Sequence, residues 1–445
     1  MNKIRMKSYI YAAVIGIGVM LLAGPAQSAA VDPHSSYIGS NFEDYYVNIP
    51  AAKVQWSSSM DIQADNYSMG KGVVAVGGAK VFVLQKGQLV AFNVQSGKLL
   101  WKYGSKLKSP LLYQEGILYV TSEAGTIYAV NATTGKNKWS SNVKTQGVTQ
   151  LTVDKDQLFV ANGDIGAYRL KDGVFQWRDD YSEGFYEPLL VEGNLVLAEN
   201  TISGAYMYDV LHALDRTTGK QLWESGNHAL PIAATTGTIL SQRLANLMDL
   251  LPLTTLDSLD VKTGKIVKTV EYNPNHIDPN NPELGNGFVS SGGKAWISGN
   301  RMYINEGATI YGYPANTDPA TVTRDTYSST GSGQLLTYAA GPYDGRILFS
   351  NGESIYGVKT ANKSLVSYSG LSRPIARFDL LGHGMYVAQT DGKLVVINLL
   401  TAAPVVQLQT SGRVFGPTIL ENGMIIVQSK GKLTVFKEPQ ILSMK

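Results

Sequence analysis

Short apolar runs separated by polar turns repeat along most of the chain, and no helical period lies between them. Residues 110–141 contain four such runs in a row, PLLYQ, ILYVTS, TIYAVN and NKWSS. Runs of this length, rich in Val, Ile, Leu and Tyr and bounded by Gly, Asp or Asn, are typical of β-strands. The pattern therefore predicts an all-β protein built from units of four short strands.

A tryptophan ends several of these units at a regular spacing. Five of the chain's six tryptophans are separated by 45, 38, 38 and 46 residues: Trp56, Trp101, Trp139, Trp177 and Trp223. A unit of that length with four strands is the size of one β-propeller blade. Counted by the third strand, nine units are present. The later ones are degraded, and in the fifth Lys268 stands where the tryptophan would fall.

The two ends of this repeat complement each other. The fragment Lys53–Trp56 matches only the fourth strand of a unit, whereas the last unit, KLTVFKEPQ at 432–440, stops without a fourth strand. We therefore expect the N-terminal strand to complete the last blade and close the ring, which leaves few free sheet edges.

A polar turn such as N-A-T-T-G-K joins the third strand of a unit to the fourth. A tight reversal favours residues that adopt positive φ without strain, which explains Gly97, Gly135, Gly219 and Gly264. Asn and Asp side chains at the start of the turn can accept hydrogen bonds from its amides, as at Asn131, Asp215 and Asp260. Thr hydroxyls can do so more weakly, as at Thr134, Thr218 and Thr263. The tryptophan then lies on the outermost strand, where its ring can cover the seam between blades. The turn is thus a fastener rather than a binding site.

The pattern G-x-x-x-A-x-(D/N)-x-x-T-G-K-x-x-W resembles the quinoprotein-type, or PQQ-like, β-propeller repeat. The resemblance is strong over residues 53–268 and weaker over 300–437. It implies a propeller of usually eight blades, so the nine units counted here leave eight and nine as alternatives. It extends to the propeller lipoproteins of outer-membrane protein assembly in Gram-negative bacteria, whose lipid-bearing cysteine this chain lacks. An assembly role is what that resemblance implies.

The N-terminus has the features of a secretory signal peptide. Lys3, Arg5 and Lys7 precede the apolar run 10–23, which is short for a retained membrane anchor, and small residues follow it. We expect cleavage between Ser28 and Val31, a periplasmic or extracellular location, and no membrane span in the mature protein. The expected domains are a signal peptide at 1–30, an N-terminal extension at 31–52, the propeller at 53–437 and a tail at 438–445.

Charge and cysteine content narrow the functional classes. The chain has 38 basic and 35 acidic residues, and removing the signal (38 minus 3) leaves 35 of each. With no basic cluster, we expect no nucleic-acid binding. The absence of cysteine excludes disulfides, Cys-based zinc sites and the vicinal pair that often covers PQQ in the quinone enzymes. No Gly-Lys pair is followed by Ser or Thr, and no G-x-S-x-G is present, so no catalytic residue is assigned.

The histidines lack the H-x-x-H spacing of metal sites: His34, His212, His228, His276 and His383. His212, on a third strand, is expected to be a packed side chain. His276 lies in the loop NPNHIDPNNPE, residues 273–283. Its oxygen donors Asp278, Asn280, Asn281 and Glu283 could hold calcium. The loop's prolines favour a solvated excursion between blades instead, and we expect no metal site.

Two further stretches depart from the repeat. In residues 241–256 an apolar face at Leu244, Leu247, Met248 and Leu251 fits a helix that packs on the rim or docks a partner. Aromatic residues that could stack on sugars, or simply fill strands, occur at Tyr37, Tyr45, Tyr46, Phe185 and Tyr186.

The sequence therefore favours an exported, monomeric, non-catalytic β-propeller that binds an unidentified protein partner as a platform. The alternatives are a PQQ-dependent dehydrogenase that uses calcium and a cell-wall glycan-binding protein. Residues that would bind a cofactor are not assigned.

Overall fold

The computed structural model describes residues 48–62, 73–179, 181, 183–204, 207–245, 253–278 and 292–444. The chain divides into two compact units at Asn48, and the second, Ile49–Lys445, contains every strand described below. The segment expected to be a signal peptide lies outside the described residues, as do His34, Tyr37, Tyr45 and Tyr46.

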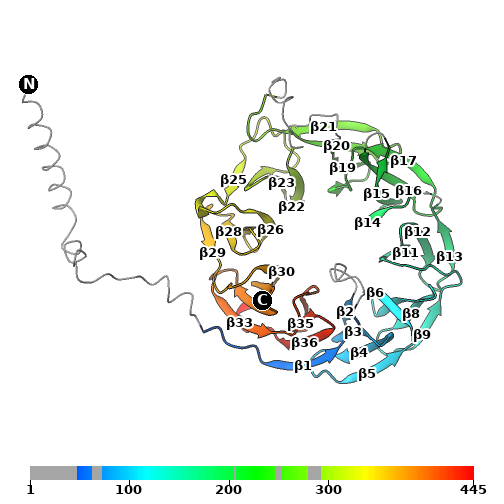
Figure 1. Cartoon of the computed structure of the whole chain (residues 1–445). Coiled ribbons are helices and arrows are strands. Elements are labelled where there is room, and N and C mark those ends of the chain that lie inside the picture. The colour runs from blue at the N-terminus through cyan, green and yellow to red at the C-terminus, as the bar shows by residue number, and fades with distance from the viewer. Residues whose placement is uncertain are drawn as a thin grey trace, which may run out of the picture. The chain divides into compact units, whose positions relative to one another are not determined.

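The described strands form nine antiparallel sheets of four strands, arranged as blades around a ring (Figure 1). In each blade the strands run in chain order from the innermost to the outermost, except in the last. Nine blades confirm the count of repeat units, and the eight blades usual for the resembled family are not what this chain has.

Blades 1 to 3 follow the repeat closely. Blade 1 has β2 (Val74–Gly77), β3 (Lys80–Gln85), β4 (Gln88–Asn93) and β5 (Leu99–Tyr103). Blade 2 has β6 (Leu107–Gln114), β7 (Ile117–Ser122), β8 (Ile127–Asn131) and β9 (Asn137–Ser140). Blade 3 has β10 (Gln150–Asp154), β11 (Gln157–Ala161), β12 (Ile165–Arg169) and β13 (Phe175–Arg178).

Blades 4 to 6 contain the longest strands of the ring and the shortest. Blade 4 has β14 (Tyr186–Glu192), β15 (Leu195–Ser203), β16 (Met207–Asp215) and β17 (Gln221–Gly226). Blade 5 has β18 (Ala233–Ala234), β19 (Thr238–Gln242), β20 (Thr254–Asp260) and β21 (Ile266–Tyr272). Blade 6 has β22 (Lys294–Ser298), β23 (Arg301–Glu306), β24 (Thr309–Pro314) and β25 (Asp325–Ser328).

Blades 7 to 9 are the degraded repeats. Blade 7 has β26 (Thr337–Tyr343), β27 (Arg346–Ser350), β28 (Ile355–Lys359) and β29 (Leu365–Ser367). Blade 8 has β30 (Ile375–Leu381), β31 (Gly384–Gln389), β32 (Lys393–Asn398) and β33 (Pro404–Gln409). Blade 9 has β34 (Ile419–Glu421), β35 (Met424–Ser429), β36 (Lys432–Lys437) and β1 (Val54–Ser59). Two 3₁₀ turns, η2 (Thr330–Ser332) and η3 (Gln440–Leu442), complete the assignment.

The N-terminal strand closes the ring. β1 pairs antiparallel with β36 as the outermost strand of blade 9, with Trp56 opposite Val435 and Ser59 opposite Lys432. This pairing confirms the expected completion of the last unit. It places a strand from the start of the repeat and three from its end in one sheet (Figure 1).

The core is a series of clusters that neighbouring blades share. The middle strands are buried on both faces, as in β3 and β4, where four consecutive residues of each are buried. One cluster combines Phe82 and Leu89 of blade 1 with Leu118 and Val130 of blade 2. A strand covered on both faces excludes water from every side chain, which explains why these runs are continuously apolar rather than alternating.

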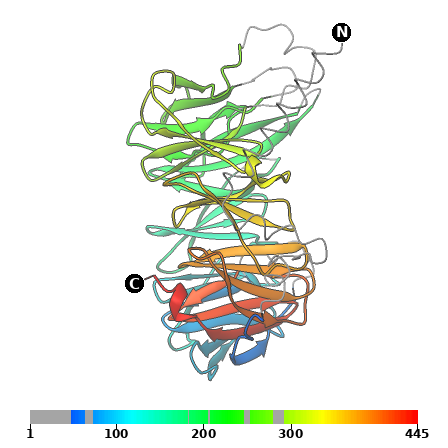
Figure 2. The same ribbon diagram turned by 90° about the vertical axis from the view of Figure 1, so that its left-hand side faces the viewer.

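The topology gives the ring two different faces. In an antiparallel blade, the turns 1→2 and 3→4 lie at one end, while the turns 2→3 and the connections to the next blade lie at the other. We call these the hairpin face and the loop face. In the side view the strands run across the thickness of the ring from one face to the other (Figure 2).

Candidate functional sites

Five seams between blades are sealed by an indole. Each tryptophan on an outermost strand donates its Nε1–H to the carbonyl of the first residue after the third strand of the next blade. These bonds are Trp56 to Val94 (2.8 Å), Trp101 to Ala132 (3.2 Å), Trp139 to Leu170 (2.8 Å), Trp177 to Arg216 (2.9 Å) and Trp223 to Val261 (2.9 Å). The prediction that the tryptophan covers the seam is therefore confirmed.

The same indole lies against the turn glycine of the next blade. A Cβ on Gly219, where φ is +73°, would lie 2.2 Å from Cε3 of Trp177, and one on Gly173 would lie 2.3 Å from Cε3 of Trp139. The glycine is thus required twice, for its positive φ and for the space that the neighbouring ring occupies.

The turn itself is held by its own side chains, as predicted. Asp260 Oδ1 accepts from the amides of Lys262 (3.1 Å) and Thr263 (2.9 Å) and from the Thr263 hydroxyl (2.8 Å). The Thr263 hydroxyl, together with these amides, lowers the pKa of Asp260. The Thr263 oxygen accepts weakly from the Lys265 amide at 3.4 Å.

Three later seams are closed by other groups. Between blades 6 and 7, Lys363 of blade 7 donates to Asp325 of blade 6 (2.9 Å). Between blades 7 and 8, the Tyr368 hydroxyl reaches the carbonyl of Leu399 at 3.4 Å. Between blades 8 and 9, residues 49–52 run beside β33, and the Ala52 amide donates to Gln407.

The seam between blades 5 and 6 contains a cavity of about 180 Å³ instead. Lys268 pairs with Ser258 in the register in which Trp223 pairs with Ala213 one blade earlier, so Lys268 occupies the tryptophan position. Ala315 is the first residue after β24, which is the position of the indole's acceptor in the other seams. Lys268, Ser258 and Ala315 all line the cavity.

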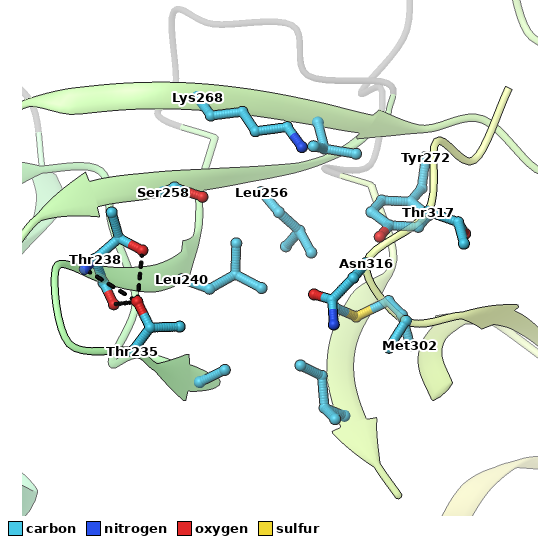
Figure 3. Close-up of a pocket in the computed structure, with 14 residues that line it drawn as sticks. Thr235, Thr238, Leu240, Leu256, Ser258, Lys268, Tyr272, Met302, Asn316 and Thr317 are labelled. Atoms are coloured by element: carbon cyan, nitrogen blue, oxygen red, sulfur yellow. Dashed lines mark hydrogen bonds between the residues drawn. The ribbon is translucent and has the colours of Figure 1, made fainter. Parts of the chain in front are cut away.

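The cavity has an apolar floor and a polar rim. Figure 3 shows Leu240 and Leu256 at its centre, Thr235 and Thr238 at one side, and Asn316 with Met302 at the other. Leu256 and Met302 are buried, whereas Lys268 and Asn316 are exposed. Within the described residues, the Lys268 ammonium makes no hydrogen bond or ion pair, and no donor reaches the Ala315 carbonyl.

A buried charge network lies towards the loop face of blade 5. Asp257, fully buried on β20, accepts from His228 Nε2 (2.9 Å), from Arg243 (2.7 and 2.8 Å) and from the Thr269 hydroxyl (2.6 Å). His228 Nδ1 lies 2.9 Å from the Ser225 hydroxyl and 2.9 Å from the Gly226 carbonyl. Burial by itself raises the pKa of Asp257, but these hydrogen bonds outweigh it and lower that pKa to about 2.

Ser225, His228 and Asp257 belong to one hydrogen-bonded network, which we call the Asp257 clamp. The Ser225 hydroxyl and the Gly226 carbonyl both lie at Nδ1 of His228, and the Asp257 carboxylate lies at Nε2. The clamp fixes the end of β17, the Arg243 bridge after β19 and the outermost strand β21 to one carboxylate.

His212, on the third strand of blade 4, is a packed side chain as predicted. It is fully buried, with Tyr181 and Phe185 rings at 4.7 and 5.3 Å, and Nε2 lies 2.9 Å from Asn200 Oδ1. Burial lowers the pKa of His212. Because Phe185 is also buried, its ring is not available to stack on a sugar.

The loop face carries exposed apolar side chains beside these networks. β15 and β16 are nine residues each, the longest described strands, and Met207 at the start of β16 is 59% exposed. Leu335, in the connection from blade 6 to blade 7, is 89% exposed. Ile62 and Val414 follow outermost strands in the same way and are also exposed. Single exposed apolar side chains are normal on a protein surface, whereas contiguous ones mark interaction sites.

Two sequence-derived expectations fall partly outside the described residues. Ser241 and Gln242 end β19 and Thr254–Leu256 begin β20, so the stretch is an insertion between two paired strands, and Leu244 is in neither helix nor strand. The other three positions of the apolar face, Leu247, Met248 and Leu251, lie outside the description, as do Asn280, Asn281 and Glu283 of the calcium loop.

A quinone bound with calcium needs several protein oxygen ligands that converge on the ion. No three His, Asp or Glu side chains of the described ranges converge to hold a metal. Two carboxylates on innermost strands are engaged by protein groups: Asp379 by Arg377 and the Thr418 amide, and Asp154 by Arg216. These residues do not fit that group. No helix of the described part is long and apolar enough to cross a membrane.

Comparison with known proteins identifies the repeat. The family described as outer membrane protein assembly factor BamB matches residues 46–173 and 143–281. A relative of that name from Alkalilimnicola ehrlichii is 27% identical over 144 residues, 28% of this chain and 37% of the relative. A tetrathionate hydrolase from Acidithiobacillus ferrooxidans is 25% identical over 152 residues, 30% of each chain. The matches thus span little more than a third of these relatives. The BamB structure from Moraxella catarrhalis has 17% identity, covers 74% of this chain and 94% of that one, and gives a TM-score of 0.47.

Proposed function

Because this chain belongs to the BamB family of PQQ-like β-propellers, we propose that it is an exported, non-catalytic platform that binds proteins through its loop face. The observation that carries the proposal is the pair of exposed apolar side chains, Met207 and Leu335, on that face. Under this proposal the protein acts in the periplasm or outside the cell after cleavage of residues 1–30, as a monomer and without PQQ, calcium or nucleic acid.

The strands and hydrogen bonds that hold the Met207 hairpin in place support a protein-binding role for the loop face. The extended hairpin β15–β16 rises from blade 4, in which Glu199 accepts from the amide of Leu230 and Thr201 donates to Asp209 (2.5 Å). The Asp257 clamp holds the adjoining blade. A loop surface on rigid supports binds a partner with a small entropic cost, because little of it must be ordered on binding.

Site-specific photocrosslinking in the producing cell tests the proposal. A benzophenone amino acid is placed at Met207 or Leu335 and, as matched controls, at Leu222 and Val267, which are 47% and 58% exposed on outermost strands. We expect a discrete crosslinked partner from the loop-face positions only. Equal products from the controls, or none from positions 207 and 335, would contradict the proposal.

A substitution pair makes the test quantitative. We expect Met207→Ser with Leu335→Ser to reduce recovery of the crosslinked partner, probed from Ile62, about tenfold, whereas Leu222→Ser with Val267→Ser leaves it unchanged. An unaltered yield in the first pair would show that the apolar side chains do not bind the partner.

A further inference from the structure

We propose that the cavity between blades 5 and 6 is a binding site for a small aromatic acid whose ring carries an N–H or O–H donor. The cavity opens beside the outermost strand β21 and the β24–β25 turn, at the hairpin face, so the proposal does not depend on the loop-face platform.

The first support is the repeated structure of the ring itself. In five seams an aromatic ring fills the equivalent position and donates to the equivalent carbonyl. At this seam the walls are kept: Leu256 and Ser258 on one blade correspond to Leu211 and Ala213, and Met302 and Ile297 on the other correspond to Ile239 and Ala234. The ring itself is missing from the chain, and Asp318 stands where the turns of the indole seams have glycine.

The second support is size. An apolar cavity of about 150 Å³ can hold a benzene ring, and this cavity measures about 180 Å³. Its mouth is lined by exposed Lys268 and Asn316, so a larger bicyclic ring can extend towards solvent.

The third support is the chemistry of two polar groups that line the cavity, the Ala315 carbonyl and the Lys268 ammonium. The Ala315 carbonyl corresponds to the acceptor that every indole seam satisfies, and no described donor reaches it. Lys268 supplies a cationic group that makes no ion pair within the described residues. A ring N–H or O–H can donate to the Ala315 carbonyl, and a carboxylate can pair with the Lys268 ammonium.

Calorimetry and ligand-observed NMR with the full chain test the assignment. The probes are indole-3-carboxylate, its 1-methyl derivative, neutral indole, and an end-blocked Gly-Trp-Gly peptide. We expect indole-3-carboxylate to bind about tenfold more tightly than the 1-methyl derivative, which cannot donate to Ala315, and more tightly than neutral indole. Equal affinity of the first two, or tightest binding by the peptide, would overturn the assignment to a small acid with a ring donor.

Two variants locate the site. Lys268→Trp fills the cavity from within and should abolish binding of every probe, whereas Lys265→Trp, on the exposed turn before β21, should leave binding unchanged. Lys268→Met should remove the preference for the acid over neutral indole and retain ring binding. Undiminished binding to Lys268→Trp would place the probe elsewhere and refute the site; the wild-type comparison of methylated and unmethylated probes stands even if that variant does not fold.

Discussion

The seam between blades 3 and 4 and the seam between blades 5 and 6 have the same backbone plan, but an indole closes only the first. In the first, Trp177 is buried, lies on Gly219 and donates to Arg216. In the second, Lys268 leaves the indole position empty, and the adjacent Thr269 ties the outermost strand to buried Asp257 of its own blade. The comparison teaches that an outermost strand can be held by an indole packed on the next blade or by a buried carboxylate within its own blade, and the two respond differently to substitution and pH.

The largest expected effect comes from removing an indole. Trp177→Ala should lower the free energy of unfolding by about 3–5 kcal/mol, because a buried aromatic side chain and a hydrogen bond are lost together. Chemical denaturation measures the change. The control Lys268→Ala, at the matching position of blade 5, should change stability by less than about 0.5 kcal/mol; a comparable loss there would abolish the distinction between the seams.

The next largest loss of unfolding free energy is expected from the turn glycine that the indole contacts. Gly219→Ala should cost about 2–4 kcal/mol, because positive φ alone costs about 1–2 kcal/mol and the new Cβ also collides with Trp177. Gly193→Ala in the same blade is the matched control, since Gly193 has φ +58° and nothing within 4 Å of the added carbon. If both variants lose the same amount, the ring contact contributes nothing beyond backbone strain.

Acid should destabilise blade 5, whose strands are joined through Asp257, more than blade 3. The folded pKa of Asp257 is about 2, below its ordinary 3.8, so its stabilisation is complete above about pH 4 and is lost as pH falls towards 2. The difference corresponds to about 2 kcal/mol. Hydrogen exchange of β20 and β21 against β12 and β13 over this range measures it, and Asp257→Asn should flatten the response. Equal acid sensitivity of both blades would disprove the local origin.

The smallest effect is a gain. Lys268→Trp should raise stability by about 0.5–2 kcal/mol, the usual result of filling a cavity. Thermal unfolding compared with Lys265→Trp measures it. A loss instead would mean that the β24–β25 turn, which has Asp318 where the turns of the five indole seams have glycine, cannot accept a ring that is part of the chain.

Most of this architecture follows from local patterns in the sequence. The spacing of Trp56 and its counterparts predicts blades, and the incomplete ends predict that β1 closes blade 9. The count of third strands predicts the nine blades correctly, whereas the eight blades usual in the resembled family do not apply to this chain. Lys268 is visible in the sequence as a missing tryptophan, but the cavity is not, because its walls come from residues such as Leu240 and Met302 that meet only in the fold.

The charge clamp could not be read from the sequence either. His228, Arg243 and Asp257 have no characteristic spacing, and they meet because Arg243 bridges to His228 at the end of β19. The helical period around Leu244 stays a prediction, because Leu247, Met248 and Leu251 lie outside the described residues.

The closure of blade 9 by β1 sets an order on biosynthesis. A ribosome makes β1 before any other strand of the propeller, yet its partner β36 is the last strand to be made. β1 must therefore remain unpaired while eight blades are synthesised. Any interruption of translation before β36 leaves an open array with two bare edges, which chaperones or proteases can recognise.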